Sequence, residues 1–246
     1  MKHDRGLTLV ETLVVMAIFA ILLSITIPIL RSAIANAQTT RNLTNMSLTM
    51  KDFFAWSNQN TSRMVNKGVP PANSPFGYLT QQSSWPEVLY DAFGEASQHW
   101  QSSLSDPNDF AESYGGVAAL NNILDSDPSF AWRLPSDFLY SFNMLTTSHV
   151  WKYPGVSLSS MHEFGTHFSY VLLSDIAHPS QKGVLLHDYQ EPGPGNQRLI
   201  AFADGAAAQR DLVAAVPAAA YPMDPDPNKR ATPILSTLNG FAGHDF

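Results

Sequence analysis

Cysteine is absent from this 246-residue sequence, and charged residues are scarce. No disulfide, zinc–thiolate site or cysteine nucleophile can form, so a domain outside the cytoplasm would be held by its core alone. Charged residues make up 14% and apolar residues 44%, which is typical of a folded chain and not of a disordered one. The formal net charge of -7 argues against a nucleic-acid partner, which would call for a basic face.

Signatures of common enzymes are also missing. The sequence has no Gly-x-Ser-x-Gly elbow, no phosphate-binding loop and no dinucleotide fingerprint. His162 and His167 lie five residues apart, whereas the zinc-protease motif needs a spacing of four to place both on one helical face. We therefore expect no catalytic residue and no enzyme activity.

Calcium is the only metal ion for which the sequence leaves a binding site possible. Calcium takes several oxygen ligands, and aspartates occur in turn-like segments. These are Asp125, Asp127, Asp188, Asp204, Asp224 and Asp226. No EF-hand pattern is present, so we assign no metal ligand and expect no cofactor.

A long apolar run lies near the N-terminus. Leu7–Leu30 contains 24 residues and one charge, Glu11. As a helix it would reach about 36 Å, which is enough to cross a hydrocarbon core of about 30 Å. A secretory signal peptide is disfavoured because its apolar region is shorter and ends in a small-residue cleavage site. A plain membrane anchor explains the length but not Glu11, whose charge is costly in hydrocarbon.

The segment Arg5-Gly6-Leu7-Thr8-Leu9-Val10-Glu11 resembles the processing site of type IV prepilins and type II secretion pseudopilins. In that family a prepilin peptidase cuts a short charged leader after its Gly and N-methylates the new first residue. The resemblance implies cleavage between Gly6 and Leu7, methylation of Leu7, and Glu11 as the fifth mature residue. It also places Pro28 where the family often has a helix-bending proline. Leu7 departs from the family's usual Phe.

The resemblance implies a structural filament subunit of a type IV pilus or a type II secretion pseudopilus, major or minor. Glu11 would be an assembly residue, because a buried amine on a neighbouring subunit needs a countercharge. The implied partners are prepilin peptidase, other pilin subunits, the inner membrane and, indirectly, an assembly ATPase and platform protein. A basic leader kept in the cytoplasm would leave the head in the periplasm or at the cell surface. The alternative is a membrane-anchored extracytoplasmic binding module or enzyme with a pilin-like leader.

The remaining pattern predicts an α+β, pilin-like fold, with a long N-terminal helix packed on a C-terminal antiparallel β-sheet head. Apolar residues at helical spacing between Ile34 and Phe53 predict that the helix continues beyond the apolar run. The expected parts are a leader at 1–6, a transmembrane helix at 7–30, its amphipathic continuation at 31–60, and a head at 61–246. The head divides into a variable insertion at 61–135, a sheet at 136–215 and an irregular tail at 216–246.

Within the head, turn residues separate the expected elements. Strands are predicted at 138–145, 168–173, 183–187 and 198–202, and short helices at 85–93 and 117–124. Asp204-Gly205 predicts a hairpin turn. His187 and Asp204 partly resemble a prepilin-like group with a His before Asp-Gly, but the spacing is longer here, so neither receives a role.

Overall fold

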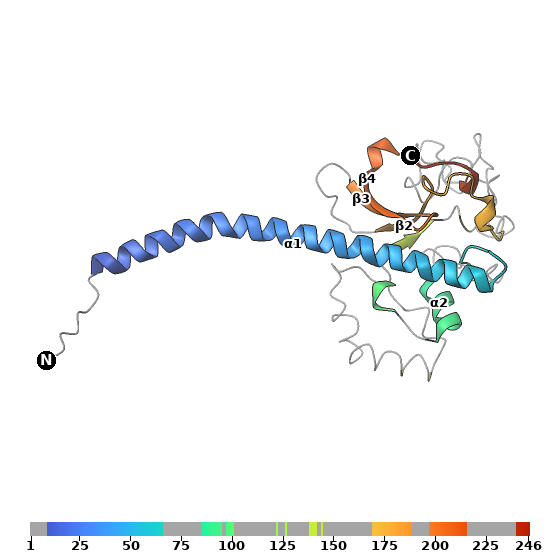
Figure 1. Cartoon of the computed structure of the whole chain (residues 1–246), viewed down its shortest axis with the longest axis horizontal. Coiled ribbons are helices and arrows are strands. Elements are labelled where there is room, and N and C mark those ends of the chain that lie inside the picture. Colours follow the sequence, from blue (N-terminus) through green and yellow to red (C-terminus); the bar gives the residue numbers. More distant parts are fainter. Residues whose placement is uncertain are drawn as a thin grey trace, which may run out of the picture. The chain divides into compact units, whose positions relative to one another are not determined.

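The computed structural model describes residues 9–65, 85–94, 97–100, 122, 126, 138–141, 144, 169–187, 197–215 and 240–246. Its helices and strands are α1 (Leu9–Gln59), α2 (Trp85–Phe93), β1 (Phe138–Tyr140), β2 (Gly183–His187), β3 (Gln197–Phe202) and β4 (Ala207–Asp211) (Figure 1). The chain divides into two compact units, Met1–Thr40 and Arg41–Phe246. The second unit is the head, and it includes the C-terminal part of α1.

Helix α1 has 51 residues and continues through Pro28. Proline removes one backbone donor and crowds the carbonyl four residues earlier, which membrane-spanning helices tolerate. The hydroxyls that precede it bond within the helix: Ser24 Oγ donates to the carbonyl of Ile21 at 2.7 Å, and Thr26 Oγ1 to that of Leu23 at 3.3 Å. These polar side chains are therefore satisfied without water, as an apolar surrounding requires.

The C-terminal part of α1 is amphipathic, and the predicted long helix is confirmed. Met46, Met50, Phe53 and Trp56 are buried and recur every three or four residues, so they form one apolar stripe. In Figure 1 this part of α1 lies between the sheet on one side and α2 on the other, and side chains of all three elements share one core.

Helix α1 ends in a left-handed turn that contains no glycine. Thr61 and Ser62 have φ angles of 58° and 59°, and the Ser62 N–H donates to the Ser57 carbonyl at 2.8 Å. This is the hydrogen bond of a Schellman cap, in which glycine usually occupies the left-handed position. Thr61 is β-branched, so its backbone is strained there.

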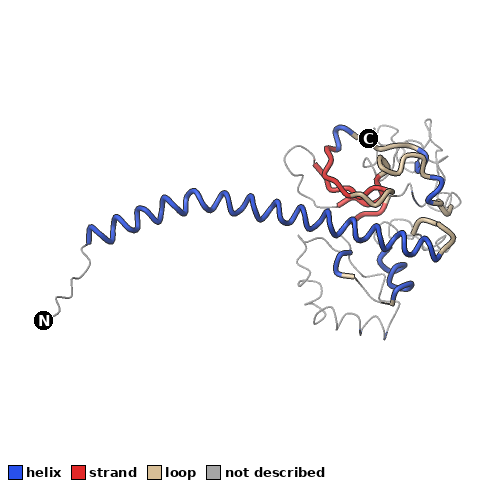
Figure 2. Tube along the Cα trace, in the orientation of Figure 1, coloured by secondary structure: helices blue, strands red, loops and turns tan. Residues whose placement is uncertain are grey.

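The strands form one sheet of order β1-β2-β3-β4, and every neighbouring pair is antiparallel (Figure 2). Strands β3 and β4 pair from Gln197 opposite Asp211 to Ala201 opposite Ala207. Together with α1 this confirms the α+β, pilin-like fold.

The two faces of the sheet bury different clusters. Phe138, Tyr140, Leu185, Leu199 and Ala201 join the core that contains α1 and α2. The opposite face carries Leu186, Ile200 and Phe202, with partly buried Leu139, Ala208, Leu212 and Phe246 against them. Residues alternate between the faces along β3, as a strand requires.

Strands β2 and β3 confirm the predictions at 183–187 and 198–202, and α2 confirms the helix at 85–93. The helix predicted at 117–124 lies outside the described residues, except for Asn122. Among the described residues of the strand predicted at 138–145, only Phe138–Tyr140 pairs as β1, and Met144 is in a 3-10 turn.

The strand predicted at 168–173 is wrong in its described part. Leu172 forms a single bridge with Arg63, and a 3-10 helix begins at Leu173. The Asp175 carboxylate accepts the Leu172 N–H at 3.1 Å, which closes a turn where a ladder would have continued.

The hairpin predicted at Asp204-Gly205 joins β3 to β4. Gly205 has φ 88°, its N–H donates to the Phe202 carbonyl at 2.9 Å, and the Phe202 N–H donates to the Ala206 carbonyl at 2.8 Å. The Asp204 carboxylate accepts the Ala206 N–H at 2.9 Å. The bonds describe a turn followed by a left-handed glycine, which is a common three-residue hairpin loop.

Candidate assembly site

The N-terminal part of α1 exposes apolar side chains all round. Glu11 lies in the first described turn of α1, where a carboxylate is favoured by the helix dipole. Every residue from 9 to 37 is exposed. The large apolar ones include Leu9, Leu13, Phe19, Ile25 and Leu30. Gly6 and Leu7 lie outside the described residues.

The exposed apolar surface of this part of α1 has to be covered by lipid or by another protein. Among the described residues, α1 is long and apolar enough to cross a membrane. An apolar surface of this extent marks a membrane or protein contact and is unusual on a soluble monomer. This part of α1 is therefore a candidate membrane anchor, and Glu11 is the carboxylate within it.

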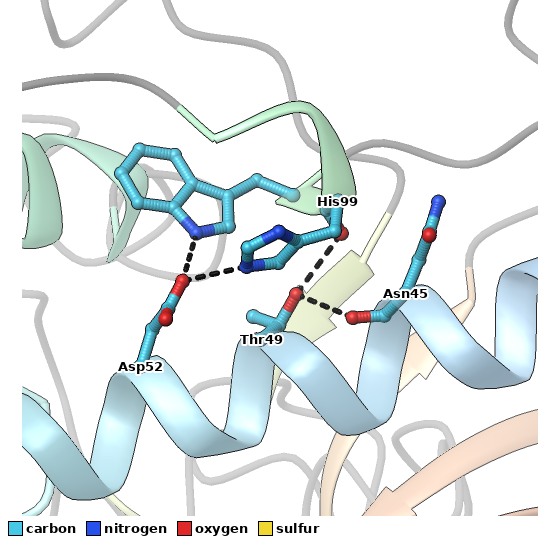
Figure 3. Close-up of polar contacts among 5 residues, drawn as sticks. Asn45, Thr49, Asp52 and His99 are labelled. Carbon is cyan, nitrogen blue, oxygen red and sulfur yellow. Dashed lines mark hydrogen bonds and ion pairs between the residues drawn. The ribbon is translucent and has the colours of Figure 1, made fainter.

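On the head, Asp52 ties α1 to a 3-10 turn at Gln98–Trp100. Its Oδ2 lies 2.7 Å from Nε2 of His99 and accepts the indole N–H of Trp100 at 2.8 Å (Figure 3). The hydroxyl of Thr49, one helical turn earlier, lies 3.1 Å from the His99 carbonyl oxygen and 2.9 Å from the Asn45 carbonyl oxygen, and these two acceptors share its single proton. Backbone and side chain of the turn are thus both bonded to one face of the helix.

The Asp52–His99 pair resembles part of a catalytic triad, but its neighbours indicate a structural role. Both side chains are about a quarter exposed, at 25% and 24%. The nearest hydroxyl in Figure 3, that of Thr49, points to backbone carbonyls and not to the imidazole. The same Asp52 oxygen also holds Trp100, a core side chain. The arrangement fixes the turn to α1, and we assign it no reaction.

A second tether joins α1 to the β3–β4 hairpin. Ser47 Oγ donates to the Gly205 carbonyl at 3.0 Å. A Cβ on Gly205 would lie 3.0 Å from the Phe54 ring, so the glycine also allows close packing of hairpin and helix. The hairpin glycine therefore serves both the turn and the helix contact.

An ion pair is buried where the last described residues meet the sheet. Lys182 and Asp245 have no solvent exposure, and Lys182 Nζ lies 3.3 Å from Asp245 Oδ1. The other carboxylate oxygen accepts the Gly183 N–H at 2.7 Å, and the Asp245 N–H donates to the Gln181 carbonyl at 2.9 Å. Burial lowers the pKa of Lys182, and attraction to Asp245 acts in the opposite direction.

The residues singled out from the sequence are dispersed. His187 is buried in β2, with its ring centroid 5.8 Å from that of Phe138, and Asp204 belongs to the hairpin. His162 and His167 lie outside the described residues, as do all the calcium candidates except Asp204. Within the part of the chain that the structure describes, no three His, Asp or Glu side chains gather as metal ligands would.

Sequence reasoning missed the residues that hold the head together. Asp52, His99, Trp100, Lys182 and Asp245 pair across 47 to 63 positions, and no local pattern marks such partners. The only signal was Asp52 itself, an acidic residue beside the apolar stripe of α1.

A long helix with a sheet packed on its C-terminal part is consistent with an α+β, pilin-like fold. Residues 1–27 match the prokaryotic N-terminal methylation motif, the prepilin-type cleavage and methylation segment. The match supports a protein similar to type IV pilins and pseudopilins, and favours a structural subunit over an enzyme. Neither the comparison with curated proteins nor that with solved structures gave a match.

Proposed function

We propose that this protein is a structural subunit of a type IV pilus-like or type II secretion pseudopilus filament. A prepilin peptidase cleaves it between Gly6 and Leu7 and methylates the new amine of Leu7. The observation that supports this proposal is the methylation motif at residues 1–27, which includes the beginning of helix α1, and residues 9–37 of that helix are all exposed.

Glu11 neutralises the new amine of an adjacent subunit during assembly. When apolar helices pack side by side, a positive amine loses its water and needs an anionic partner. Apart from Thr12, the exposed side chains around Glu11 are apolar, namely Leu9, Val10, Leu13 and Val14, so a carboxylate there has a purpose other than solubility. Pro28 bends the helix within the packed bundle. The hydroxyl groups of Ser24 and Thr26, close to Pro28, already donate to backbone carbonyls. They therefore add no unpaired polar group to the apolar interior of the helix bundle.

The protein is anchored in the inner membrane with its head outside the cytoplasm, and it polymerises with other subunits of its kind. A separate assembly ATPase and platform protein drive polymerisation. In this function the chain contributes no catalytic residue, metal or cofactor.

The test is the N-terminal mass of the full chain, extracted from membranes of cells that contain its own peptidase. We expect an N-terminus at Leu7 with one added methyl group. An N-terminus retained at Met1 would contradict the proposal and favour the alternative, a membrane-anchored binding module or enzyme. A cut after the apolar run would indicate a secreted protein.

Glu11 has a matched pair of variants. Glu11→Gln keeps size and polarity but removes the charge, whereas Glu11→Asp keeps the charge on a shorter side chain. We expect both to be cleaved, Glu11→Gln to lose filaments, and Glu11→Asp to retain a part of them. Normal filaments from Glu11→Gln would show that the carboxylate does not pair with an amine.

A further inference from the structure

Two histidines from distant parts of the sequence lie side by side at the surface of the head. His178 follows the 3-10 helix Leu173–Asp175, and His244 lies in the last described segment, 240–246. Their ring centroids are 5.7 Å apart, the ring planes make an angle of 88°, and both residues are exposed. No local pattern in the sequence predicts this pair, because the fold alone brings its members together.

Backbone hydrogen bonds hold the two histidine-bearing segments against each other. The Gln181 N–H donates to the His178 carbonyl at 3.0 Å, and the Asp245 N–H donates to the Gln181 carbonyl at 2.9 Å. The Asp245 side chain is fully buried in its ion pair with Lys182, which anchors the residue next to His244. Both imidazoles therefore extend from backbone that is already fixed, so a ligand between them has little backbone ordering to offset.

The hydrogen bond of His244 determines which of its ring nitrogens can bind a metal ion. Nδ1 lies 3.0 Å from the backbone oxygen of Phe246. Because that oxygen can only accept, Nδ1 carries the proton, and in the neutral ring Nε2 keeps its lone pair. Metal-binding histidines almost always donate their other N–H to a carbonyl, a carboxylate or water in this way. The His178 ring forms no hydrogen bond with the described residues, so either of its nitrogens is available.

The spacing of the two rings suits two ligands of one ion. Zinc–nitrogen bonds are about 2.0–2.1 Å long, and the ion is tetrahedral, so two imidazoles on one zinc have centroids about 5 Å apart. The observed 5.7 Å is close to that value. Exposed side chains change rotamer within nanoseconds, so a small rotation of either ring closes the difference.

We propose that His178 and His244 together bind one divalent transition-metal ion of the zinc class. Imidazole suits zinc, copper and nickel, whereas calcium and magnesium require oxygen ligands. Water completes the coordination, because both histidines are exposed and no third His, Asp or Glu of the described residues joins them. The bound ion links the segment 240–246 to the loop that precedes β2, and the inference does not depend on the proposed filament function.

The test is the thermal midpoint of the full chain in detergent, carrying no histidine tag, with ZnCl2 as the probe. An ion that binds only the folded head, at about ten times its dissociation constant, should raise the midpoint by about 3–6 °C. Excess EDTA should reverse the shift.

Two single variants remove one ligand each. His244→Asn deletes Nε2 but keeps an N–H near the position of Nδ1, so the bond to the Phe246 oxygen can persist. His178→Ala deletes the other imidazole at an exposed position. Each should weaken zinc binding at least about tenfold, because losing even the hydrogen-bond partner of a ligand costs about 10–100-fold in affinity. Since both positions are exposed, the midpoint without metal should change by no more than about 2 °C.

A matched control and a second readout separate metal binding from a structural role. His162→Asn with His167→Ala removes two other histidines that are close in the sequence, and it should keep the wild-type zinc affinity. With CuCl2 as the probe, electron paramagnetic resonance should detect two coordinated nitrogens in the wild type and one in each single variant. Loss of a structural contact would not change that count.

Loss of the zinc shift in both single variants, with the shift kept in the control, is the expected result. The site is overturned if millimolar zinc leaves the wild-type midpoint unchanged. It is also overturned if the shift persists when His178→Ala and His244→Asn are combined, or if only one of the single variants loses it, because the two imidazoles then do not share the ion. None of these results bears on the filament function, which is tested by cleavage before Leu7.

Discussion

Replacing Asp245 by Asn removes one charge from a buried ion pair and leaves the other in place. Neither Lys182 nor Asp245 is exposed, so water cannot solvate the remaining ammonium group. Breaking a buried pair in this way costs about 3–5 kcal/mol. Asn can still accept the Gly183 N–H that Asp245 accepts at 2.7 Å, so the loss is mainly electrostatic. Asp245→Leu also leaves the Gly183 N–H without an acceptor, so it should lower the free energy of unfolding by about 1–3 kcal/mol more than Asp245→Asn.

The cost translates into a large shift of the unfolding temperature. For a domain the size of the unit Arg41–Phe246, 1 kcal/mol shifts the midpoint by about 2–4 °C. Asp245→Asn should therefore lower the midpoint by roughly 6–20 °C. Adding Lys182→Met removes the unpaired ammonium, and the double variant should unfold within about 5 °C of wild type, because an apolar replacement of a buried pair is often neutral.

The pH dependence has a definite sign. Burial lowers the pKa of Lys182 in the folded state, whereas the unfolded chain has an ordinary lysine pKa of about 10.4. Between those two values the unfolded state binds more protons, so the free energy of unfolding rises with pH. Below the folded pKa the cost of burying the charge is fully present. Relative to the neutral Lys182→Met, Asp245→Asn double variant, the wild type should therefore gain stability as the pH rises towards 10.4.

Thermal unfolding of the full chain in detergent, followed by tryptophan fluorescence, measures these effects. Trp85 and Trp100 are buried in the head and report its packing. The reasoning would be refuted if Asp245→Asn shifted the midpoint by less than about 2 °C. It would also be refuted if the double variant unfolded as early as the single one.

The same assay tests three further changes. Thr61→Gly should raise the free energy of unfolding by about 1 kcal/mol by relieving the left-handed strain; a loss of stability would mean that the Thr61 side chain makes a contact worth more than the strain. Gly205→Ala should lower the free energy of unfolding by about 1–2 kcal/mol, since φ is 88° and the new Cβ would lie 3.0 Å from the Phe54 ring. Adding Phe54→Leu should restore part of this loss. An unchanged stability in Gly205→Ala would contradict the close packing of Gly205 against Phe54. Asp52→Asn should lower the free energy of unfolding by about 1–2 kcal/mol, because Asn can still accept the Trp100 indole N–H but loses the charge beside His99. An unchanged stability would show that Asp52 does not help to hold the 3-10 turn on α1.

Local signals were sufficient for much of the fold. The long apolar run and the stripe from Met46 to Trp56 define α1, since helical periodicity persists over many turns. Strand β2 was predicted with its observed bounds because GVLLH is apolar and branched between two turns. The Asp-Gly pair marked its hairpin through the φ angle that only glycine adopts readily.

The missed elements depend on partners distant in sequence. Strand β4 reads Ala-Ala-Gln-Arg-Asp, which has no β-branched or aromatic residue, and it is extended because the hairpin aligns it with β3. At 168–173 the error was the reverse, because a strand was predicted where none forms. The apolar residues there resemble a strand, but the Asp175 carboxylate closes a turn by accepting the Leu172 N–H. The tethers at Asp52 and the pair at Lys182 could not be predicted at all, because nothing in a single sequence specifies which distant side chains meet.

The burial pattern divides α1 into two parts that can be tested separately. Residues 9–37 are all exposed, and the buried residues of α1 begin at Asn42. The hydrogen bonds described above between α1 and the head involve Ser47, Thr49 and Asp52, which all lie beyond residue 40. A change at Glu11 should therefore impair assembly without lowering the unfolding temperature of the head, whereas Asp245→Asn should lower that temperature without altering cleavage at Gly6. If Glu11→Gln destabilised the head, the two parts of α1 would be coupled, and a loss of filaments in that variant could no longer be attributed to a missing carboxylate–amine pair.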